Sequence, residues 1–389
     1  MKRRRYLKLI GGGVVLAAAG VGGFLSTRTP RDAIAPWQLA GQYTDPRKKA
    51  LSYAILAPNP HNLQPWRVDL GVEDDIRLYV DGDLRLPETD PFDRQITVGL
   101  GCFIELLTMA AAEDDLRTEV TLFPEGSDAG RLDDRPVAHI RLTRESGVAP
   151  DPLFAHALLR RSAKEPFDPD RPVPASLVAE LKRTPSLRGL NVLATVEPEP
   201  VQTLRDLTWR AFEIEYKTPA KLRESIDLMR LGKREINQTP DGIDLGGPFL
   251  ESLMALGQLS REALGDPASM AYAEGLSRYR EICDTAQGYV WVVSEGNDRT
   301  SQINAGRMWL RLNLASTGLG IGLHPLSQAL QEYDEMKALY AEAHRLLTPD
   351  AMSDAGTVQM LGRIGYAPAI APSPRWRLEK RMTPQQGVV

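Results

Sequence analysis

Hydrophobic and polar positions recur with two periods along the chain, and each period marks one kind of element. The runs "IRLYVDGD" from residue 76 and "GYVWVVSEGND" from residue 288 are rich in β-branched and aromatic residues, which predicts strands. Each is followed by a stretch with helical apolar spacing, "GCFIELLTMAAAEDD" and "GRMWLRLNLASTG". Further strands are predicted at "VAHIRLT" and "VQMLGRIGY". The pattern therefore predicts an α+β chain in which the order strand, helix, strand occurs twice.

The two strand–helix units also share a residue spacing. Asp93-Arg94, Gly101 and Leu107 recur with the same separations as Asp298-Arg299, Gly306 and Leu312. Leu is common enough to match by chance, but the shared order of elements favours a duplication. The chain is thus predicted to hold two related halves, about 26–150 and 151–389, joined near "GVAPDP". Their central helices are expected to pack together as the core of a pseudo-dimer.

The second half carries an extra stretch at about 200–285. Its segments "VQTLRDLTWRAFEIEY" and "PFLESLMALGQLSREAL" are helical by period, and "NQTPDGIDLGGP" between them is a loop by its Gly and Pro content. Such an insertion can be an extra packing layer or a lid over a site. The best lid segment is "DGIDLGGPF", 241–249, because its glycines suit a hinge.

The first 25 residues form a distinct segment. Five cations are followed by a 17-residue apolar run that contains six glycines, short and mildly hydrophobic for a membrane span. Arg3-Arg4-Arg5-Tyr6-Leu7-Lys8 resembles a twin-arginine export signal, and a plain secretory signal or a single anchor is the alternative. We expect export, with the protein periplasmic or anchored on the outer side of the membrane. Cleavage and retention of the segment both stay open.

Bulk composition narrows the classes of function. Apolar residues at 42% and charged residues at 25% are ordinary for a globular protein, and a net charge of −4 argues against nucleic acid as a partner. Two cysteines rule out a disulfide framework and a thiolate zinc cluster, and the five histidines lack HxxxH spacing. We therefore expect no metal site, and contact with a membrane only through the N-terminal segment.

Four clusters carry candidate chemistry. "APNPHNLQPWRV" from residue 57 sets Asn59, Asn62 and Gln64 beside a tryptophan between stiffening prolines, which suits either a buried corner or a cradle for a flat, polar-edged ligand. "LRRSAKEPFD" offers cations and a hydroxyl that can bind a phosphate, or can form a solvated turn. "SPRWRLEKR" and "GLGIGLHPLSQAL" are weak signals alone. In the first of these two, Arg375 and Arg377 are predicted to project on one face of an extended segment.

Together these clusters resemble the nitroreductase-like flavin oxidoreductases. The likeness rests on the Asn and Gln-Pro-Trp loop, "RRSAKEPF", the helix leading to "GLGIGLHP", and the ending "GRIGYAPAIAPSPRWR", and it covers about 45–380. With an internal duplication behind an export signal, the chain looks most like the Acg-type branch. The resemblance implies a nitroreductase-like sheet flanked by helices, and a monomer in which one chain mimics the usual homodimer.

The resemblance also implies one site for flavin mononucleotide (FMN) built across the two halves, while the symmetry-related second site no longer functions. In this implied site, cations and a hydroxyl of the second half hold the phosphate or the polar edge of the ring. The loop of the first half meets the ring, and Gln64 braces that loop. A third segment, in the second half, passes near the reactive edge of the ring. The implied residues are Arg160, Arg161, Ser162, Lys164, Arg375 and Arg377; Asn59, Asn62 and Gln64; and Pro325, Leu326 and Ser327.

Three functions follow as hypotheses. The leading one is an FMN-dependent oxidoreductase that passes hydride from a donor such as NAD(P)H, through the flavin, to a nitro, quinone or similar small-molecule acceptor. The second is a protein that stores or sequesters FMN beneath a lid with little turnover. The third has no cofactor, and its polar loop only braces a structural corner. Ser327-Gln328 replaces the acidic position found in many nitroreductases, which bears on turnover more than on flavin binding.

Overall fold

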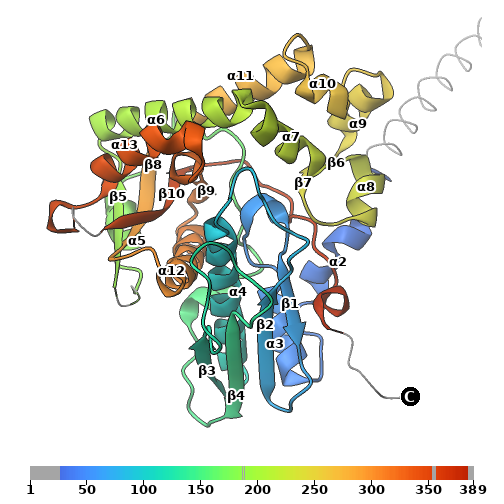
Figure 1. Cartoon of the computed structure of the whole chain (residues 1–389), viewed down its shortest axis with the longest axis vertical. Coiled ribbons are helices and arrows are strands. Elements are labelled where there is room, and N and C mark those ends of the chain that lie inside the picture. Colours follow the sequence, from blue (N-terminus) through green and yellow to red (C-terminus); the bar gives the residue numbers. More distant parts are fainter. Residues whose placement is uncertain (1–26, 186, 188, 353–355, 384–389) are drawn as a thin grey trace, which may run out of the picture.

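The computed structural model describes residues 27–383, apart from 186, 188 and 353–355. The predicted signal or anchor at 1–25 lies outside the described residues. Two antiparallel four-stranded sheets flank a pair of central helices, and further helices lie across one end of the molecule (Figure 1).

The first sheet belongs to the N-terminal half. Its strands pair in the order β1-β2-β4-β3, and every pairing is antiparallel. The elements of this half are α2 (Arg31–Leu39), α3 (Pro46–Ala54), η1 (Pro60–Asn62), β1 (Trp66–Asp69), β2 (Asp75–Val80), α4 (Arg94–Ala112), β3 (Leu116–Leu122) and β4 (Ala138–Arg144).

The second sheet repeats this topology in the C-terminal half. Its order is β5-β8-β10-β9, so each strand has a counterpart at the same place in the first sheet. The elements are η2 (Pro152–His156), α5 (Ala175–Lys182), β5 (Leu190–Thr195), β8 (Gly288–Ser294), α12 (Arg299–Gly318), β9 (Gly322–Pro325), η3 (Gln328–Leu330), η4 (Asp334–Met336), α13 (Lys337–Leu347), η5 (Asp350–Met352), β10 (Thr357–Gly365) and η6 (Leu378–Arg381). The predicted α+β fold of two related halves is confirmed.

The two halves meet where α4 crosses α12. A Cβ added at Gly306 would lie 1.9 Å from the carbonyl oxygen of Val98, and one added at Gly101 would lie 2.1 Å from that of Ile303. The two glycines matched by the repeat thus face each other across the crossing and let the backbones touch. Helix α4 is long and apolar enough to span a membrane, but 89% of its most apolar window is buried, so it is a core helix. The expected packing of the central helices is confirmed.

A largely helical insertion separates β5 from β8, at the place where the first half has only the short β1–β2 turn. It consists of α6 (Pro198–Lys217), α7 (Pro219–Asp227), β6 (Met229–Leu231), α8 (Gly232–Gln238), β7 (Ile243–Leu245), α9 (Pro248–Ala255), α10 (Arg261–Gly265) and α11 (Met270–Asp284). Strands β6 and β7 pair in parallel, so part of the stretch expected to be a loop is a strand. In Figure 1 the insertion covers the upper end of both halves.

A buried carboxyl group joins this insertion to the second half. Glu215 of α6 is buried and accepts a hydrogen bond of 2.6 Å from Nε2 of Gln331. Burial raises the pKa of Glu215 to about 7, against 4.5 in its ordinary state. The folded protein therefore binds a proton more tightly than the unfolded chain, and this contribution to stability is lost as the pH rises from 4.5 through about 7.

Glu215→Gln is accordingly expected to raise the free energy of unfolding at pH 8, by roughly 3 kcal/mol at most, and to flatten its dependence on pH between 5 and 7. Urea unfolding at several pH values measures this. Asp206→Asn, at an exposed position of the same helix, is the control. Equal pH dependence in the parent and the Glu215→Gln variant would show that Glu215 stays ionised in the folded state.

Candidate functional site

The polar loop before β1 is held in an unusual backbone conformation. His61, Asn62 and Gln64 have φ of 46°, 56° and 56°, in the left-handed region that non-glycine residues seldom adopt. Each such residue costs on the order of 1 kcal/mol, and the conformation persists only where surrounding contacts impose it. Asn59 supplies one of these contacts, because its Oδ1 accepts from the backbone N–H of Gln64 at 2.7 Å.

Gln64 ties this loop to two distant segments. Its side chain is buried; Nε2 donates to the carbonyl of Pro240 at 2.7 Å, and Oε1 accepts from the backbone N–H of Trp376 at 2.9 Å. Nearby, Nδ2 of Asn62 donates to the carbonyl of Pro374 at 3.1 Å. The loop of the first half, the insertion and the C-terminal segment therefore meet at one place, and Gln64 has the geometry of the bracing residue that the sequence predicted.

Three arginines gather beside this loop. Arg160 donates through Nη2 to the carbonyl of Leu56 at 3.1 Å, and Arg375 donates to the same carbonyl at 3.2 Å. The guanidinium of Arg161 lies 4.5 Å from the ring centre of Trp37, and that of Arg375 lies 5.7 Å from it. Arg375 also donates to Oδ1 of Asn62. The second half and the C-terminal segment thus bring three cations to the loop of the first half.

This arginine cluster (Arg160, Arg161 and Arg375) is not bound directly by any carboxylate of the described residues, although the charge of Asp244 acts on Arg375. None of the three forms an ion pair among the described residues, and buried donors lack hydrogen-bond partners: Nε and Nη1 of Arg160, Nε of Arg161 and Nε of Arg375. Burial, with a smaller effect from the neighbouring arginines, lowers the pKa of Arg160 to about 10 and that of Arg375 to about 9, and the charge of Asp244 partly opposes the shift at Arg375. Buried positive charge with free donors is the environment that an anion such as a phosphate stabilises.

Lys164 and Ser162 lie on the loop that follows Arg161. Nζ of Lys164 forms an ion pair of 3.2 Å with Asp244 in β7, and the hydroxyl of Ser162 makes no hydrogen bond within the described part of the chain. The segment before Asp244 also covers the polar loop, since the backbone N–H of Gly242 donates to the carbonyl of Asn62 at 3.1 Å. The insertion therefore lies over the predicted site, at the start of the segment predicted as a lid.

The Pro325–Ser327 segment runs along β10. Pro325 pairs with Gly362, Leu326 is fully buried, and the hydroxyl of Ser327 donates to the carbonyl of Leu361 at 3.4 Å. The link to the Lys164 loop lies two residues before Pro325, where the N–H of Ala163 donates to the carbonyl of Leu323 at 2.9 Å. Leu326 thus belongs to the core, and the contacts of Pro325 and Ser327 are with β10.

Arg363 is a buried cation that sequence reasoning missed. Its Nη2 donates to the carbonyls of Ala163, at 3.1 Å, and Glu165, at 2.6 Å, on either side of Lys164. Its Nε donates to Nδ1 of His324 at 3.1 Å, and the guanidinium lies 3.9 Å from the ring centre of Phe167. Burial and the charge of Arg363 hold the pKa of His324 well below its usual range, so this histidine is neutral. Arg363 therefore fixes the loop that carries Lys164.

The prediction that Arg375 and Arg377 share one face is wrong. Arg375 is buried in the arginine cluster, whereas Arg377 is exposed and lies near Tyr43. Alternate side chains share a face only while a segment stays extended. Arg377 itself is extended and caps the short helix η6, which begins at Leu378, and its side chain is left in solvent while that of Arg375 is buried. Arg375 alone joins the other two arginines.

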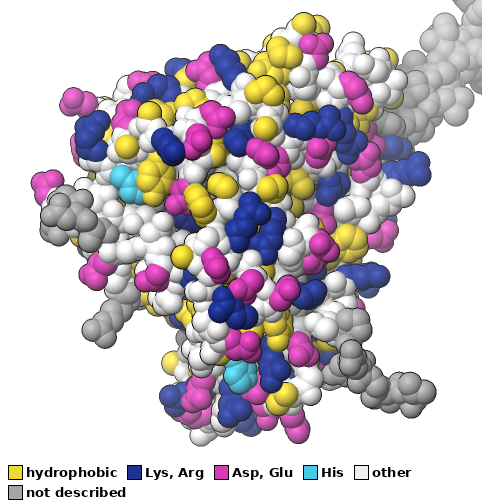
Figure 2. Space-filling model, viewed as in Figure 1, with side chains coloured by type: hydrophobic (Ala, Val, Ile, Leu, Met, Phe, Trp, Pro, Cys, Tyr) yellow, Lys and Arg dark blue, Asp and Glu magenta, His cyan; other side chains and the backbone are white. Residues whose placement is uncertain are grey.

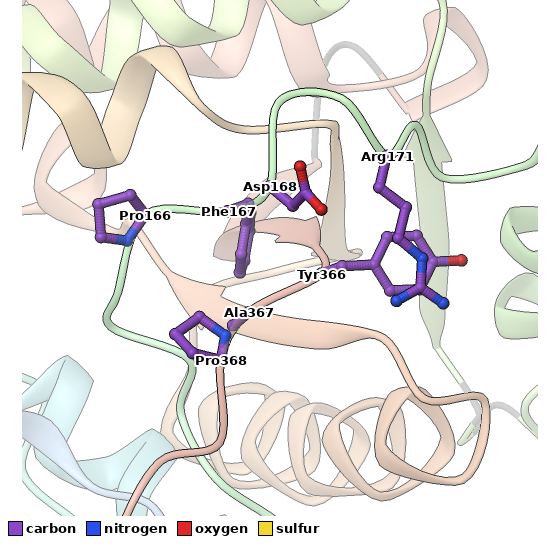
Figure 3. Close-up of a pocket in the computed structure, with 7 residues that line it drawn as sticks. All are labelled: Pro166, Phe167, Asp168, Arg171, Tyr366, Ala367 and Pro368. Carbon is purple, nitrogen blue, oxygen red and sulfur yellow. The ribbon is translucent and has the colours of Figure 1, made fainter.

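Two surface hollows are formed by other residues, although Phe167 in the first of them also packs against Arg363. One, of about 400 Å³, is lined by Pro166, Phe167, Asp168, Arg171, Tyr366, Ala367 and Pro368, with the guanidinium of Arg171 3.5 Å from the ring centre of Tyr366 (Figure 3). The other, of about 540 Å³, lies near the C-terminal end of α12. Neither is lined by a predicted site residue.

The other contributors that sequence reasoning missed are Trp37 and Asp244. Trp37 sits in a short helix far from the motifs, and nothing local distinguished it. Asp244 fell inside the predicted lid segment, 241–249, but its partner could not be read from spacing. The "GRIGY" run flagged the neighbourhood of Arg363 without indicating which carbonyls it contacts.

Comparison with known proteins gives relatives over most of the chain. No family model matches. A Mycobacterium tuberculosis protein provisionally named an NAD(P)H nitroreductase is 22% identical over 347 residues, 86% of this chain and 90% of its own length. Another from that organism, provisionally named NAD(P)H nitroreductase acg, is 24% identical over 341 residues, 85% of this chain and 92% of its own. An FMN-bound nitroreductase from Bacteroides fragilis aligns with a TM-score of 0.34 at 14% identity, over 61% of this chain and 97% of its own.

Proposed function

We propose, from the premise that this is a nitroreductase-like chain of the Acg type, that it is an FMN-dependent oxidoreductase with one flavin site built across its two halves. The observation that carries the proposal is the arginine cluster. It buries positive charge that forms no ion pair among the described residues, together with unpaired donors, between the halves, which suits the phosphate of FMN. The residues present therefore fit the cofactor.

Seven of the predicted residues, from the arginine cluster, the Lys164 loop and the polar loop, receive a role in this proposal. Arg160, Arg161 and Arg375 would hold the phosphate, with Ser162 as a further donor. Lys164 would face the polar edge of the ring, held there by Arg363. For these contacts Arg375 would exchange Oδ1 of Asn62 for the phosphate. That Oδ1 would then be free to meet the ring, while Nδ2 of Asn62 keeps its bond to the carbonyl of Pro374 and Asn59 keeps the loop in shape. When bound, FMN supplies transfer of two electrons between a donor and an acceptor, and the protein supplies orientation and electrostatics.

An absorbance spectrum of the purified protein tests this proposal. We expect flavin bands that bleach when NADPH is added without oxygen and return when a nitroaromatic or quinone is supplied. Bands that persist with NADPH would favour the second candidate, a protein that stores FMN. Dithionite, a chemical reductant, serves as the control and should bleach the bands. The absence of bands after reconstitution with FMN would exclude both.

Storage is favoured by one specific observation, the cover provided by the insertion. Asp244 neutralises Lys164, and the segment from Pro240 to Gly242 is bound to the polar loop. Both contacts hold the insertion down over the site and limit access by a donor.

Asp244→Asn separates these two candidates. It removes the partner of Lys164, so the ammonium is free to favour negative charge on the group that it faces. We expect the midpoint potential of bound FMN to become more positive, and reduction by NADPH to speed up if the insertion gates access. Spectroelectrochemical titration measures the potential, with Asp227→Asn at another position of the insertion as the control. An unchanged potential would show that Lys164 does not face the ring.

Export and a monomeric state are further parts of the proposal. The twin-arginine pattern at Arg3-Arg4-Arg5 supports export of the folded, loaded protein, and the internal pseudo-dimer supports a monomer because the usual subunit interface is satisfied within the chain. Cell fractionation of a variant with lysines at all three arginines tests the first point. Light scattering with in-line mass determination tests the second.

A further inference from the structure

Helix α9 exposes an apolar stripe that the fold does not use. No residue of α9 is buried, although its sequence is "PFLESLMA". Phe249 and Leu256 are 74% and 71% exposed, and they share one helical face with Leu253 because the spacing is i, i+4, i+7. Met270, at the start of α11, is 89% exposed. Two large exposed apolar side chains on one helical face, here Phe249 and Leu256, mark an interaction surface.

This stripe lies beside the place where the N-terminal segment joins the folded body. Nη1 of Arg28 forms an ion pair of 2.9 Å with Glu251 of α9, and Nζ of Lys233 donates to the carbonyl of Thr27 at 2.7 Å. The 17-residue apolar run ends at Leu25, two residues before Thr27. Two extended residues span about 7 Å. A bilayer that holds that run therefore lies within reach of α9.

The charges around α9 suit a lipid surface with anionic headgroups. Arg28 and Lys233 flank the helix, and Arg31 and Arg234 are exposed on the neighbouring elements α2 and α8. Glu251, the acidic residue of the helix, is paired with Arg28. Figure 2 shows further hydrophobic side chains at the upper edge of the molecule, over α10 and α11. Apolar residues beside cations are the composition of segments that lie in a membrane interface.

We propose that α9, with Met270 and these cations, is a second membrane contact that rests on the bilayer next to the N-terminal segment. This goes beyond a tether: the folded body has a fixed orientation, with the insertion facing the lipid. Phe249 and Leu256 enter the headgroup boundary, and Arg31 and Arg234 meet lipid phosphates.

A single fluorescent label tests the contact in the full chain. Cys102 and Cys283 are both buried, so a cysteine introduced by Leu256→Cys takes a polarity-sensitive nitrobenzoxadiazole label selectively. Val72→Cys is the matched control, because Val72 is also exposed but lies in the β1–β2 turn at the opposite end of the molecule (Figure 1). Both proteins are reconstituted with vesicles of phosphatidylcholine and phosphatidylglycerol, and flotation verifies that the chain is attached.

We expect the emission at position 256 to shift to the blue and to rise several-fold with vesicles, while the emission at position 72 stays unchanged. Unchanged emission at position 256 in protein that floats with the vesicles would overturn the proposal and leave only a tether. Two other results would overturn it as well. A blue-shifted emission at position 256 without lipid would mean that the chain covers its own stripe. A blue shift that appears only as the protein concentration rises would mean that a second copy of the chain covers it.

Discussion

Gly306→Ala is expected to lower the free energy of unfolding by about 3 kcal/mol, at the upper end of what overpacking a core produces. The added methyl would sit 1.9 Å from the carbonyl oxygen of Val98, which is backbone and has no side-chain rotamer to move. The helices α4 and α12 would have to separate, and with them the two sheets that they join. Loss of packing along the whole crossing follows from one methyl group because interiors are close-packed.

Thermal and urea unfolding of the purified variants measure this loss. Gly296→Ala is the matched control, since a Cβ at Gly296 meets no atom within 4 Å and the residue has no left-handed backbone. The control should unfold like the parent. Equal stability of the two variants would mean that α4 and α12 approach less closely than the shared glycines require.

The duplication could be predicted from the sequence because its signature is local. A strand, a helix and a strand each reveal themselves by period, and the matched Gly101 and Gly306 fall at one point in both copies. The identical strand orders could not be read in this way. Pairing depends on which apolar faces meet, and the insertion places a long stretch between β5 and β8 that neighbour each other in the sheet.

The candidate site was partly predictable for the same reason. Asn62, Gln64, Arg160 and Arg375 lie in conspicuous motifs, and the structure brings all four together. Trp37, Asp244 and Arg363 lie in ordinary sequence and reach the site only through tertiary contacts. Arg377 shows the opposite failure, because it lies in a conspicuous motif beside Arg375 but is exposed at the start of η6, where the sequence spacing gave no sign that only Arg375 is buried.

Arg160→Met is expected to weaken FMN binding about a hundredfold while leaving the flavin-free protein at least as stable as the parent. Two unpaired donors of Arg160, Nε and Nη1, are available to a phosphate, and losing two charge-assisted hydrogen bonds costs roughly 3 kcal/mol. In the flavin-free protein the same guanidinium is a buried charge without a carboxylate, which a methionine of similar length relieves. A variant that binds FMN more weakly but is no less stable without FMN indicates an anion site. A structural arginine would instead lower the stability of the flavin-free protein when it is replaced.

Fluorescence titration with FMN gives the affinity, and urea unfolding of flavin-free protein gives the stability. Arg377→Met is the control, since Arg377 is exposed and separate from the cluster, and it should change neither quantity. Arg160→Lys keeps the charge but loses the fork of donors, so its affinity should fall between those of the parent and Arg160→Met.

If flavin-free Arg160→Met unfolds more readily than the parent, the hydrogen bond to the carbonyl of Leu56 is the function of Arg160, and its cation is structural. Unchanged affinity in a stable Arg160→Met variant would place the phosphate elsewhere, because the unpaired donors at the junction of the halves would then serve no anion.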